Sequence, residues 1–310
     1  SGRVTKEGGK EVEEWGTKEG TQIMKGRSGG KECKMTETKP ADGYVTAESI
    51  EFTVENTKEV QKHQMLDDVT KVEISKKDIT DSSEVPGAKL IILDKDGKKV
   101  ESWTSTDKPH MVEKLPVGEY TLREEQAPDG YLIAEDVKFT VKDTGKVQKV
   151  KMKDAHPYGK LVIKKTDSTS KAALSGAEFE LREKESGKVV EKLVTDKTGT
   201  ATSGKIPIAT YKNGKVEKTV EYILVETKAP NGYELSSKKE EIRFEYKDGK
   251  TKVIEIVKEI KNTKSPSGST PTGNSPKTGD STNIWLPILL AVLSACGIGG
   301  VIWYKKKKGN

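Results

Sequence analysis

A short box that occurs three times constrains the fold of this chain more than any other feature. In each copy a glutamate is followed by a Pro/Gly turn that ends on a tyrosine: Glu37–Tyr44, Glu124–Tyr131 and Glu226–Tyr233. Residues 37–67 also align with 124–154 without a gap, and 15 of the 31 positions are identical. Proline presets φ and glycine tolerates positive φ, so each box predicts a turn after a strand that ends on the glutamate. We therefore expect duplicated domains.

The repeats divide the 310 residues into three units and a tail. The units are 1–68, which is truncated, 69–156 and 157–263. The third unit carries an insertion around Tyr211–Lys215, where Asn-Gly between extended runs predicts a hairpin tip. Val12–Trp15 matches Val100–Trp103, so the first unit is expected to begin at its second strand. This start is what we expect of a fragment or a processed form of a longer protein.

Short alternating runs separated by turn signals predict an all-β fold. In the second unit the runs are Val72–Lys76, Leu90–Leu93, Val100–Trp103, Tyr120–Glu124, Val137–Val141 and Val147–Asp154. The third unit repeats the scheme, from Leu161–Lys165 to Ile254–Asn262. Many short strands at close spacing are typical of an antiparallel β-sandwich. Charged residues make up 34% of the chain and aromatic residues 5%, which favours thin cores and solvated outer faces.

Composition also excludes several kinds of partner. The net charge is +6, but lysines and carboxylates are interspersed without a basic face or stacked aromatics, so no nucleic-acid partner is expected. The charge excess fits either weak attraction to anionic surfaces or solvated strand faces. Cys33 and Cys296 lie in a β unit and an apolar terminal segment, and no disulfide is expected between them. His63, His110 and His156 have no metal-ligand spacing, so neither a metal nor a cofactor is expected.

The tail changes character after the third unit. Residues 264–274 are rich in Ser, Pro, Thr and Gly and form an expected linker. The apolar run Ile284–Tyr304 is 21 residues long, which is enough for one membrane crossing. Lys305–Lys308 follow it and favour a cytoplasmic end, with the units outside. A buried core helix is the alternative, which the terminal position and the lysine cluster disfavour.

Ionisable side chains share faces with core residues when the strands are counted in twos. The face of Val72 and Ile74 includes Lys76, that of Tyr120 and Leu122 includes Glu124, and that of Val150 and Met152 includes Asp154. The third unit repeats this set as Lys165, Glu226 and Asn262. The truncated unit keeps Glu37 and Asp67 but has no matching lysine strand. An amine, an acid and an acyl acceptor are thus predicted to meet in the core of each complete unit.

Buried groups of these types would be reactive. Left charged and unpaired, each would cost several kcal/mol, and burial favours a neutral amine beside a protonated carboxyl. Attack of Lys76 on Asp154 would expel water, and attack of Lys165 on Asn262 would expel ammonia. Contact between the groups raises their effective concentration, so this single turnover needs no cofactor. The alternative is a buried ion pair, or strand-end residues that bend out to solvent. The repetition favours the bond.

These residues resemble a known family. Each complete unit has a three-residue motif after its opening strand, a glutamate box and a closing Asp or Asn; the motifs are Lys76-Lys77-Asp78 and Lys165-Thr166-Asp167. This combination is similar to SpaA-like, or collagen-adhesin B-type, domains of Gram-positive pilins and adhesins. The resemblance covers residues 1–263 and implies a prealbumin-like sandwich. It further implies that Lys76 and Lys165 are the amines, Glu124 and Glu226 the catalytic acids, and Asp154 and Asn262 the acceptors of isopeptide bonds. The first unit departs from the pattern at Cys33 and Pro40-Ala41, so Asp67 stays unpaired unless a lysine strand is supplied in trans.

A second resemblance concerns residues 275–310. This segment resembles a sortase sorting signal of the Leu-Pro-x-Thr-Gly type, because it has a short motif, an apolar span and then basic residues. The motif is Ser275-Pro276-Lys277-Thr278-Gly279. Such signals are cut between Thr and Gly, here Thr278 and Gly279, and the Thr carbonyl is transferred to an amine of peptidoglycan or of a pilin. This implies a cell-surface protein that is covalently attached to the wall after a membrane intermediate. Ser275 replaces the usual Leu, which leaves the sortase class open.

The leading hypothesis is a structural stalk that is anchored by sortase and stabilised by isopeptide bonds. Its expected partners are sortase, a peptidoglycan or pilin amine, and a host or matrix ligand bound through a region preceding the first unit. A pilin subunit polymerised by sortase is the alternative, although His156–Lys160 only partly matches the Tyr-Pro-Lys motif of backbone pilins. The C-terminal part of a surface enzyme is a remote alternative. Each glutamate is predicted beside a lysine, with no second carboxylate across a cleft, so no turnover enzyme is expected.

Overall fold

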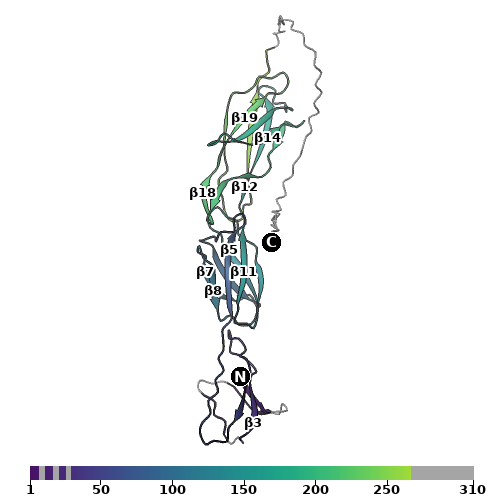
Figure 1. Ribbon diagram of the computed structural model, residues 1–310. Helices are drawn as coiled ribbons and strands as arrows, with labels where there is room; N and C mark the ends of the chain where they lie inside the picture. Colours follow the sequence, from purple (N-terminus) through teal and green to yellow (C-terminus); the bar gives the residue numbers. More distant parts are fainter. Residues whose placement is uncertain (7–10, 17–20, 26–28, 267–310) are drawn as a thin grey trace, which may run out of the picture. The chain divides into compact units, whose positions relative to one another are not determined.

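The structure is a computed structural model, and it describes residues 1–6, 11–16, 21–25 and 29–266 (Figure 1). Every regular element in these ranges is a β-strand, so the all-β prediction is confirmed. A helix long and apolar enough to cross a membrane is not found among them. Residues 267–310 hold most of the expected linker, the motif Ser275–Gly279 and the apolar run Ile284–Tyr304, and they lie outside the described ranges.

The second unit consists of two sheets, with strand orders β10-β9-β6-β7 and β11-β5-β8. Its strands are β5 (Lys71–Asp78), β6 (Lys89–Asp94), β7 (Lys99–Thr104), β8 (His110–Glu113), β9 (Gly118–Gln126), β10 (Val137–Val141) and β11 (Val147–Asp154). Alternate residues of both sheets form one core, for example Ile74 of β5, Ile92 of β6 and Leu122 of β9. Only β8 was not predicted, because its four residues show little alternation.

The third unit repeats this arrangement. One sheet has the order β14-β13-β19-β20, and in the other β12 pairs with β15, β16 and β21. Its strands are β12 (Tyr158–Asp167), β13 (Glu178–Glu183), β14 (Val189–Val194), β15 (Thr200–Thr202), β16 (Ile206–Pro207), β17 (Ala209–Lys212), β18 (Lys215–Thr219), β19 (Glu221–Lys228), β20 (Glu240–Arg243) and β21 (Val253–Asn262). Its core contains Leu161, Phe179, Leu224 and Phe244.

The first and last strands of each complete unit pair in parallel, which corrects the prediction of a wholly antiparallel sandwich. In the second unit β5 pairs with β11, and Lys76 lies opposite Met152. In the third unit β12 pairs with β21, and Lys165 lies opposite Ile260. A parallel pair needs a long crossover, and here all the intervening strands of the unit supply it. Alternation identifies strands and their faces, but it does not reveal the direction in which a strand pairs.

The first unit has one sheet in the described part of the chain, with the order β2-β1-β3-β4. Its strands are β1 (Gly2–Lys6), β2 (Glu11–Trp15), β3 (Lys31–Glu37) and β4 (Ile50–Val54). β1 takes the place of β6, since it pairs with β2 and β3 as β6 pairs with β7 and β9. Residues 60–67 align with β11 but form no strand, and Val60 and Leu66 are exposed. Among the described residues this segment has no counterpart of β5 to pair with.

The predicted hairpin tip in the third unit is confirmed. Asn213 and Gly214 connect β17 to β18 with φ values of 52° and 69°, as a tight hairpin turn requires. The hairpin contacts the second unit, because the Tyr211 hydroxyl donates a hydrogen bond to the Gly130 carbonyl at 2.8 Å. The Tyr211 ring also stacks on His156, with ring centroids 3.5 Å apart. The insertion therefore packs beside the glutamate box of the preceding unit.

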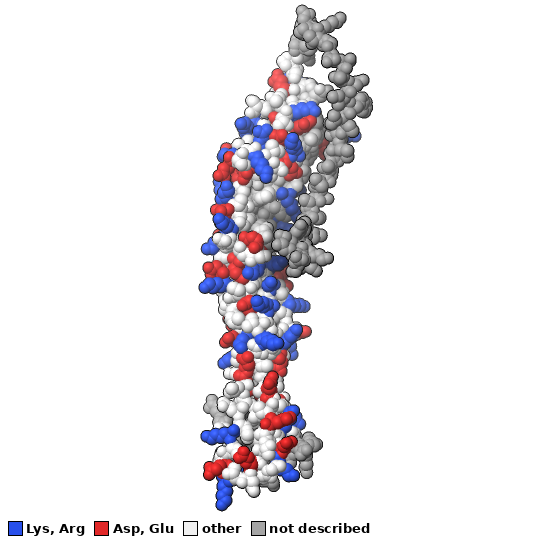
Figure 2. All heavy atoms as spheres, viewed as in Figure 1, with Lys and Arg blue, Asp and Glu red and all other residues white. Residues whose placement is uncertain are grey.

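Charges of both signs alternate over the described surface. Figure 2 shows lysines and arginines interspersed with carboxylates on the face that it presents. Many of them pair across strands, as Lys160 does with Glu255 at 3.0 Å. This face carries no continuous basic patch.

Candidate functional site

A buried lysine lies near the end of the first strand of each complete unit. Lys76 in β5 and Lys165 in β12 expose only 2% and 1% of their surface. Each occupies the inward face predicted by counting in twos from Val72 and Leu161. An ammonium group so far from water must find partners or lose its charge.

Each lysine contacts the predicted acceptor on the neighbouring strand. Lys76 Nζ lies against Asp154 Oδ1, and Lys165 Nζ lies against Asn262 Oδ1. The parallel register explains the contact, because each acceptor lies two residues beyond the residue opposite the lysine, on the same face. Asp154 is fully buried and Asn262 is 3% exposed. Groups that are 78 and 97 residues apart in sequence thus meet in the two cores.

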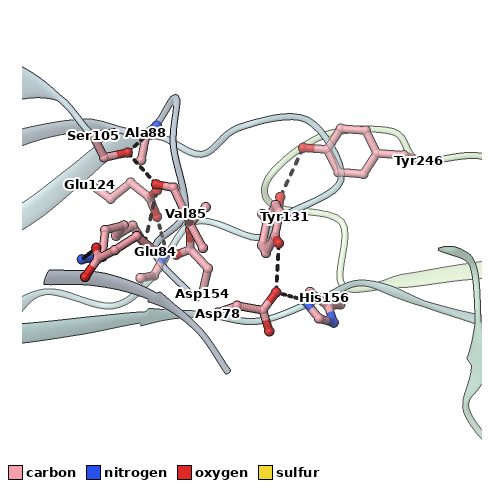
Figure 3. A network of polar contacts seen from close by, with 12 residues as sticks. Asp78, Glu84, Val85, Ala88, Ser105, Glu124, Tyr131, Asp154, His156 and Tyr246 are labelled. Carbon is pink, nitrogen blue, oxygen red and sulfur yellow. Dashed lines mark hydrogen bonds and ion pairs between the residues drawn. The ribbon is translucent and has the colours of Figure 1, made fainter. Parts of the chain in front are cut away.

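The glutamate of each box completes the cluster from the opposite sheet. Glu124 Oε1 lies 3.3 Å from Lys76 Nζ, and Glu226 Oε1 lies 3.4 Å from Lys165 Nζ. The other carboxylate oxygen is held in place by the backbone amide ten residues later: Ala134 N donates to Glu124 at 2.7 Å, and Ser236 N donates to Glu226 at 2.8 Å. In the second unit Glu124 and Asp154, both labelled in Figure 3, thus contact the same amine.

The surroundings shift the lysines toward the neutral amine. Burial lowers the pKa of Lys76 to about 8, although the nearby charge of Glu124 acts in the opposite direction. Burial likewise lowers the pKa of Lys165, although the nearby charge of Glu226 acts in the opposite direction. An ordinary lysine has a pKa of about 10.4, so both amines are neutral far more often than a surface lysine at the same pH. A neutral amine is the form that can attack an acyl carbon.

The acid also faces the atom that would leave. In the third unit Asn262 Nδ2 donates hydrogen bonds to Glu226 Oε1 and Oε2 at 3.0 and 3.1 Å. One carboxylate therefore contacts both the amine and the amide nitrogen. In the second unit Asp154 Oδ2 is buried without a hydrogen-bond partner among the described residues. An unsatisfied oxygen of this kind is costly in a stable carboxylate, but it would be removed if the carboxyl were converted to an amide.

Comparison with known families identifies the two complete units. The family model for the SpaA prealbumin-like fold domain matches residues 70–156 and 159–260. The chain belongs to this family. Each complete unit is thus a SpaA domain, and the resemblance seen in the glutamate boxes is confirmed at the level of the fold.

Several solved structures are similar to this chain. The Bacillus anthracis TIE protein has 23% sequence identity and a TM-score of 0.49, with 85% of this chain and 49% of that chain covered. This chain thus spans about half the length of the TIE protein. A streptococcal ancillary pilin has 17% identity and a TM-score of 0.29, with 76% of each chain covered. BcpA, the major pilin subunit of Bacillus cereus, has 16% identity and a TM-score of 0.26, with 63% of this chain and 99% of that chain covered. The comparison with curated proteins gives no match.

The truncated first unit does not assemble such a cluster. Glu37 is half-buried, and Ala47 N donates to its Oε2 at 2.8 Å, as in the two SpaA domains. Asp67, however, is exposed. The structure therefore holds the acid in its usual place but does not bring the acceptor to it. Whether Asp67 accepts a lysine from another strand stays a prediction.

Two features of the sites were missed in the sequence. The backbone amides of Ala134 and Ser236 hold the glutamates, and a backbone donor leaves no residue-type signal beyond the constant spacing. Asp78 and Asp167 are buried next to the lysines and bind the box tyrosines, although only their presence in the motif had been noted. The described residues contain no group of His, Cys, Asp and Glu side chains suited to a metal ion.

Proposed function

We propose that the two SpaA domains form internal Lys–Asp and Lys–Asn amide bonds and serve as a stiff stalk in a wall-anchored surface protein of Gram-positive bacteria. One observation carries the proposal: a lysine, a glutamate and an acyl acceptor are buried in contact, twice, on the first strand, the box strand and the last strand of a SpaA domain. No cofactor is needed, and the reaction occurs once per domain, so the chain is not a turnover enzyme.

In the third unit Glu226 would act as a proton shuttle. Lys165 gives a proton to Glu226 and becomes a neutral amine, which attacks the Cγ atom of Asn262. Glu226 then protonates the departing nitrogen, which it already contacts at 3.0 Å. The C–N bond to Lys165 forms and the C–N bond to Nδ2 breaks. Of the two protons that the Lys165 ammonium loses, one leaves with the released ammonia and the other remains on Glu226. Effective concentration in the buried site supplies much of the rate.

In the second unit the same steps would expel water. Lys76 transfers a proton to Glu124, and the neutral amine attacks Asp154 Cγ. Asp154 Oδ2, protonated by Glu124, leaves as water. The Lys76 ammonium loses two protons, and Glu124 passes both to the departing oxygen. One amide and the Glu124 carboxylate therefore replace the three charged groups. Burial favours this outcome because it penalises the charges that Lys76 and Asp154 lose.

The position of the bonds explains the proposed mechanical role. Tension enters the second unit along β5 and leaves along β11, and the amide would join these strands near their ends. Force would pass through Lys76 and Asp154 and would not load the residues between them. The third unit has the same arrangement in β12 and β21. A covalent bridge between the strands that carry the load would prevent either domain from extending.

The proposed attachment depends on the tail. Cleavage by sortase between Thr278 and Gly279 would transfer the Thr278 carbonyl to an amine of peptidoglycan, after the apolar run Ile284–Tyr304 has held the chain in the membrane. Incubation with sortase and a short amine acceptor should yield a product that ends at Thr278. If the acceptor is instead a lysine of a second copy, the protein is a pilin, and wall extracts should contain a ladder of high-mass polymers.

Single-molecule extension tests the stalk. The wild-type chain, held at its two ends, should show no extension of the residues between Lys76 and Asp154 or between Lys165 and Asn262. A chain with Glu124→Ala and Glu226→Ala should release about 270 and about 340 Å more contour length, at roughly 3.5 Å per residue over the 78 and 97 residues. Release of both lengths by the wild-type chain would refute the proposal.

A further inference from the structure

The tyrosine that closes each box binds an aspartate two residues after the reactive lysine. In the second unit the Tyr131 hydroxyl donates to Asp78 Oδ2 at 2.7 Å, which Figure 3 shows. In the third unit the Tyr233 hydroxyl donates to Asp167 Oδ2 at 2.9 Å. The aspartates are 1% and 2% exposed. The chemistry proposed above uses neither pair, so a buried carboxylate recurs beside each site without a role.

Each of these hydrogen bonds joins the two sheets of its unit. Asp78 ends β5 in one sheet, and Tyr131 follows β9 of the other sheet. Lys76 precedes Asp78 by two residues on the same strand face, and Glu124 lies on β9 at the start of the box. Sheets that pack face to face are joined mainly by apolar side chains, which set the distance between the sheets but make few directional contacts. A hydrogen bond next to the site fixes the lysine strand against the glutamate turn.

The turn is also tied to the acceptor strand, by a backbone hydrogen bond. Leu132 N donates to Ala155 O at 2.9 Å, and Glu234 N donates to Thr263 O at 3.0 Å. Each carbonyl belongs to the residue directly after the acceptor. The box turn is therefore attached to the amine strand through the tyrosine hydroxyl and to the acceptor strand through the backbone. All three reacting groups are positioned relative to one short segment.

The truncated unit separates these two attachments. Val45 N donates to Asp68 O at 2.9 Å, so the backbone attachment is present there too. Tyr44 is the box tyrosine of this unit, and its ring lies 5.1 Å below the ammonium group of Lys114. The described residues of this unit include no lysine strand and hence no matching aspartate. The tyrosine–aspartate bond thus accompanies the reactive lysine, whereas the turn forms without it.

The electrostatics keep the bond intact near neutral pH. Burial acts to raise the pKa of Asp78, but hydrogen bonds from Thr80 and the box tyrosine contribute to lowering it to about 2. Hydrogen bonds from the Ser170 backbone and from Tyr233 likewise lower the pKa of Asp167 to about 2. The carboxylates stay ionised and the phenols stay protonated, so both bonds are charge-assisted.

We propose that Asp78 with Tyr131, and Asp167 with Tyr233, are positioning residues for amide formation. Each pair holds the lysine strand so that the amine, the glutamate and the acyl carbon remain in contact. This inference rests on the proposed function, because it assigns a role within that reaction. A displacement of about 1 Å can slow a positioned reaction about 100-fold, so loss of one of two attachments should slow it by about 10-fold.

The test follows both bonds in the full chain after cell-free synthesis. Samples are quenched in denaturant at successive times, digested, and assayed by mass spectrometry for the linked peptides of each unit. Tyr131→Phe should slow the Lys76–Asp154 bond by about 10-fold and leave the Lys165–Asn262 bond within about twofold. Tyr233→Phe should do the reverse. Asp78→Asn keeps a carbonyl that accepts from the tyrosine, and it should therefore react faster than Asp78→Ala.

Tyr120→Phe and Tyr222→Phe are the matched controls. These tyrosines are buried too, and they donate to Pro116 O at 2.8 Å and Pro207 O at 2.6 Å, away from the boxes. Both controls should form their bonds at the wild-type rate. Melting curves of all variants in a Glu124→Ala, Glu226→Ala background report the loss of folded population without any crosslink.

The outcomes separate this inference from the proposed function. Absence of linked peptides in the wild-type chain would overturn the proposed function itself. If the wild type is linked, the positioning role fails in any of three cases. In the first case Tyr131→Phe and Tyr233→Phe form their bonds at the wild-type rate. In the second case each variant slows the bonds of both units alike. In the third case each variant slows its bond no more than its control variant does, or no more than its loss of folded fraction accounts for.

Discussion

Replacement of Lys165 by methionine tests how strongly the proposed amide stabilises the third unit. Methionine fills a similar volume without an amine, so it prevents the bond and also removes the buried charge. Lys165 and Asn262 are 97 residues apart. A crosslink over that distance lowers the entropy of the unfolded chain, which raises its free energy by about 4.7 kcal/mol at 25 °C. The variant should lose about this much free energy of unfolding.

That loss converts to a large change in melting temperature. A unit of roughly 100 residues has an unfolding entropy of about 0.21 kcal/mol/K near its Tm. The Tm of the third unit should therefore fall by about 20 °C. Differential scanning calorimetry of the chain measures this transition directly, and peptide mass analysis of the same samples shows whether the bond is present.

Lys164→Met is the matched control for this prediction. Lys164 is the preceding residue of β12 and is exposed on the opposite face of the strand. Its replacement should leave the Tm of the third unit within a few degrees and the bond in place. Equal melting temperatures for Lys165→Met and Lys164→Met, in samples of which only Lys164→Met is linked, would refute the reasoning on stability.

Three further predictions concern the leaving group, the amine and the hairpin. Asn262→Asp should still form the bond to Lys165 but release water in place of ammonia, which intact mass distinguishes; an unlinked product would contradict the mechanism. Because the pKa of Lys76 is lowered to about 8, the linking rate of the second unit should rise with pH up to about 8 and then level off, whereas a flat profile from pH 6 to 8 would contradict it. Gly214→Ala would place a Cβ 1.9 Å from Glu84 O, at a residue whose φ is +69°. Gly187 has the same φ but no neighbour within 4 Å, so Gly187→Ala should lower the free energy of unfolding only by the roughly 1 to 2 kcal/mol of a left-handed alanine. Gly214→Ala should lower the free energy of unfolding, measured in urea, by more than that. Equal urea midpoints for the two alanine variants would contradict the hairpin contact.

The inward lysines, glutamates and acceptors were predictable because each strand has one buried face and a period of two. Counting from Val72 placed Lys76 in the core, and counting from Tyr120 placed Glu124 there. Apolar side chains in the cores carry that signal, since only burial forces the alternation. The direction of β11 was not predictable in this way, because parallel and antiparallel partners show the same alternation.

Other parts of the site depend on contacts that residue types do not encode. Glu124 is oriented by the backbone amide of Ala134, and any residue except proline could supply that donor. Asp78 and Tyr131 are 53 residues apart, and their contact follows from the packing of the two sheets. Asp67 shows that a matching residue type does not ensure the contact. It aligns with Asp154 in the repeat, yet it is exposed. The described part of the first unit offers no strand with which the segment of Asp67 could pair.

The intact mass of the chain tests the central claim most directly. The wild-type protein, denatured and reduced, should weigh less than its sequence by one water and one ammonia. Glu124→Ala should restore the water, Glu226→Ala should restore the ammonia, and the double variant should have the full sequence mass. A folded wild-type chain with its full sequence mass would contradict the account.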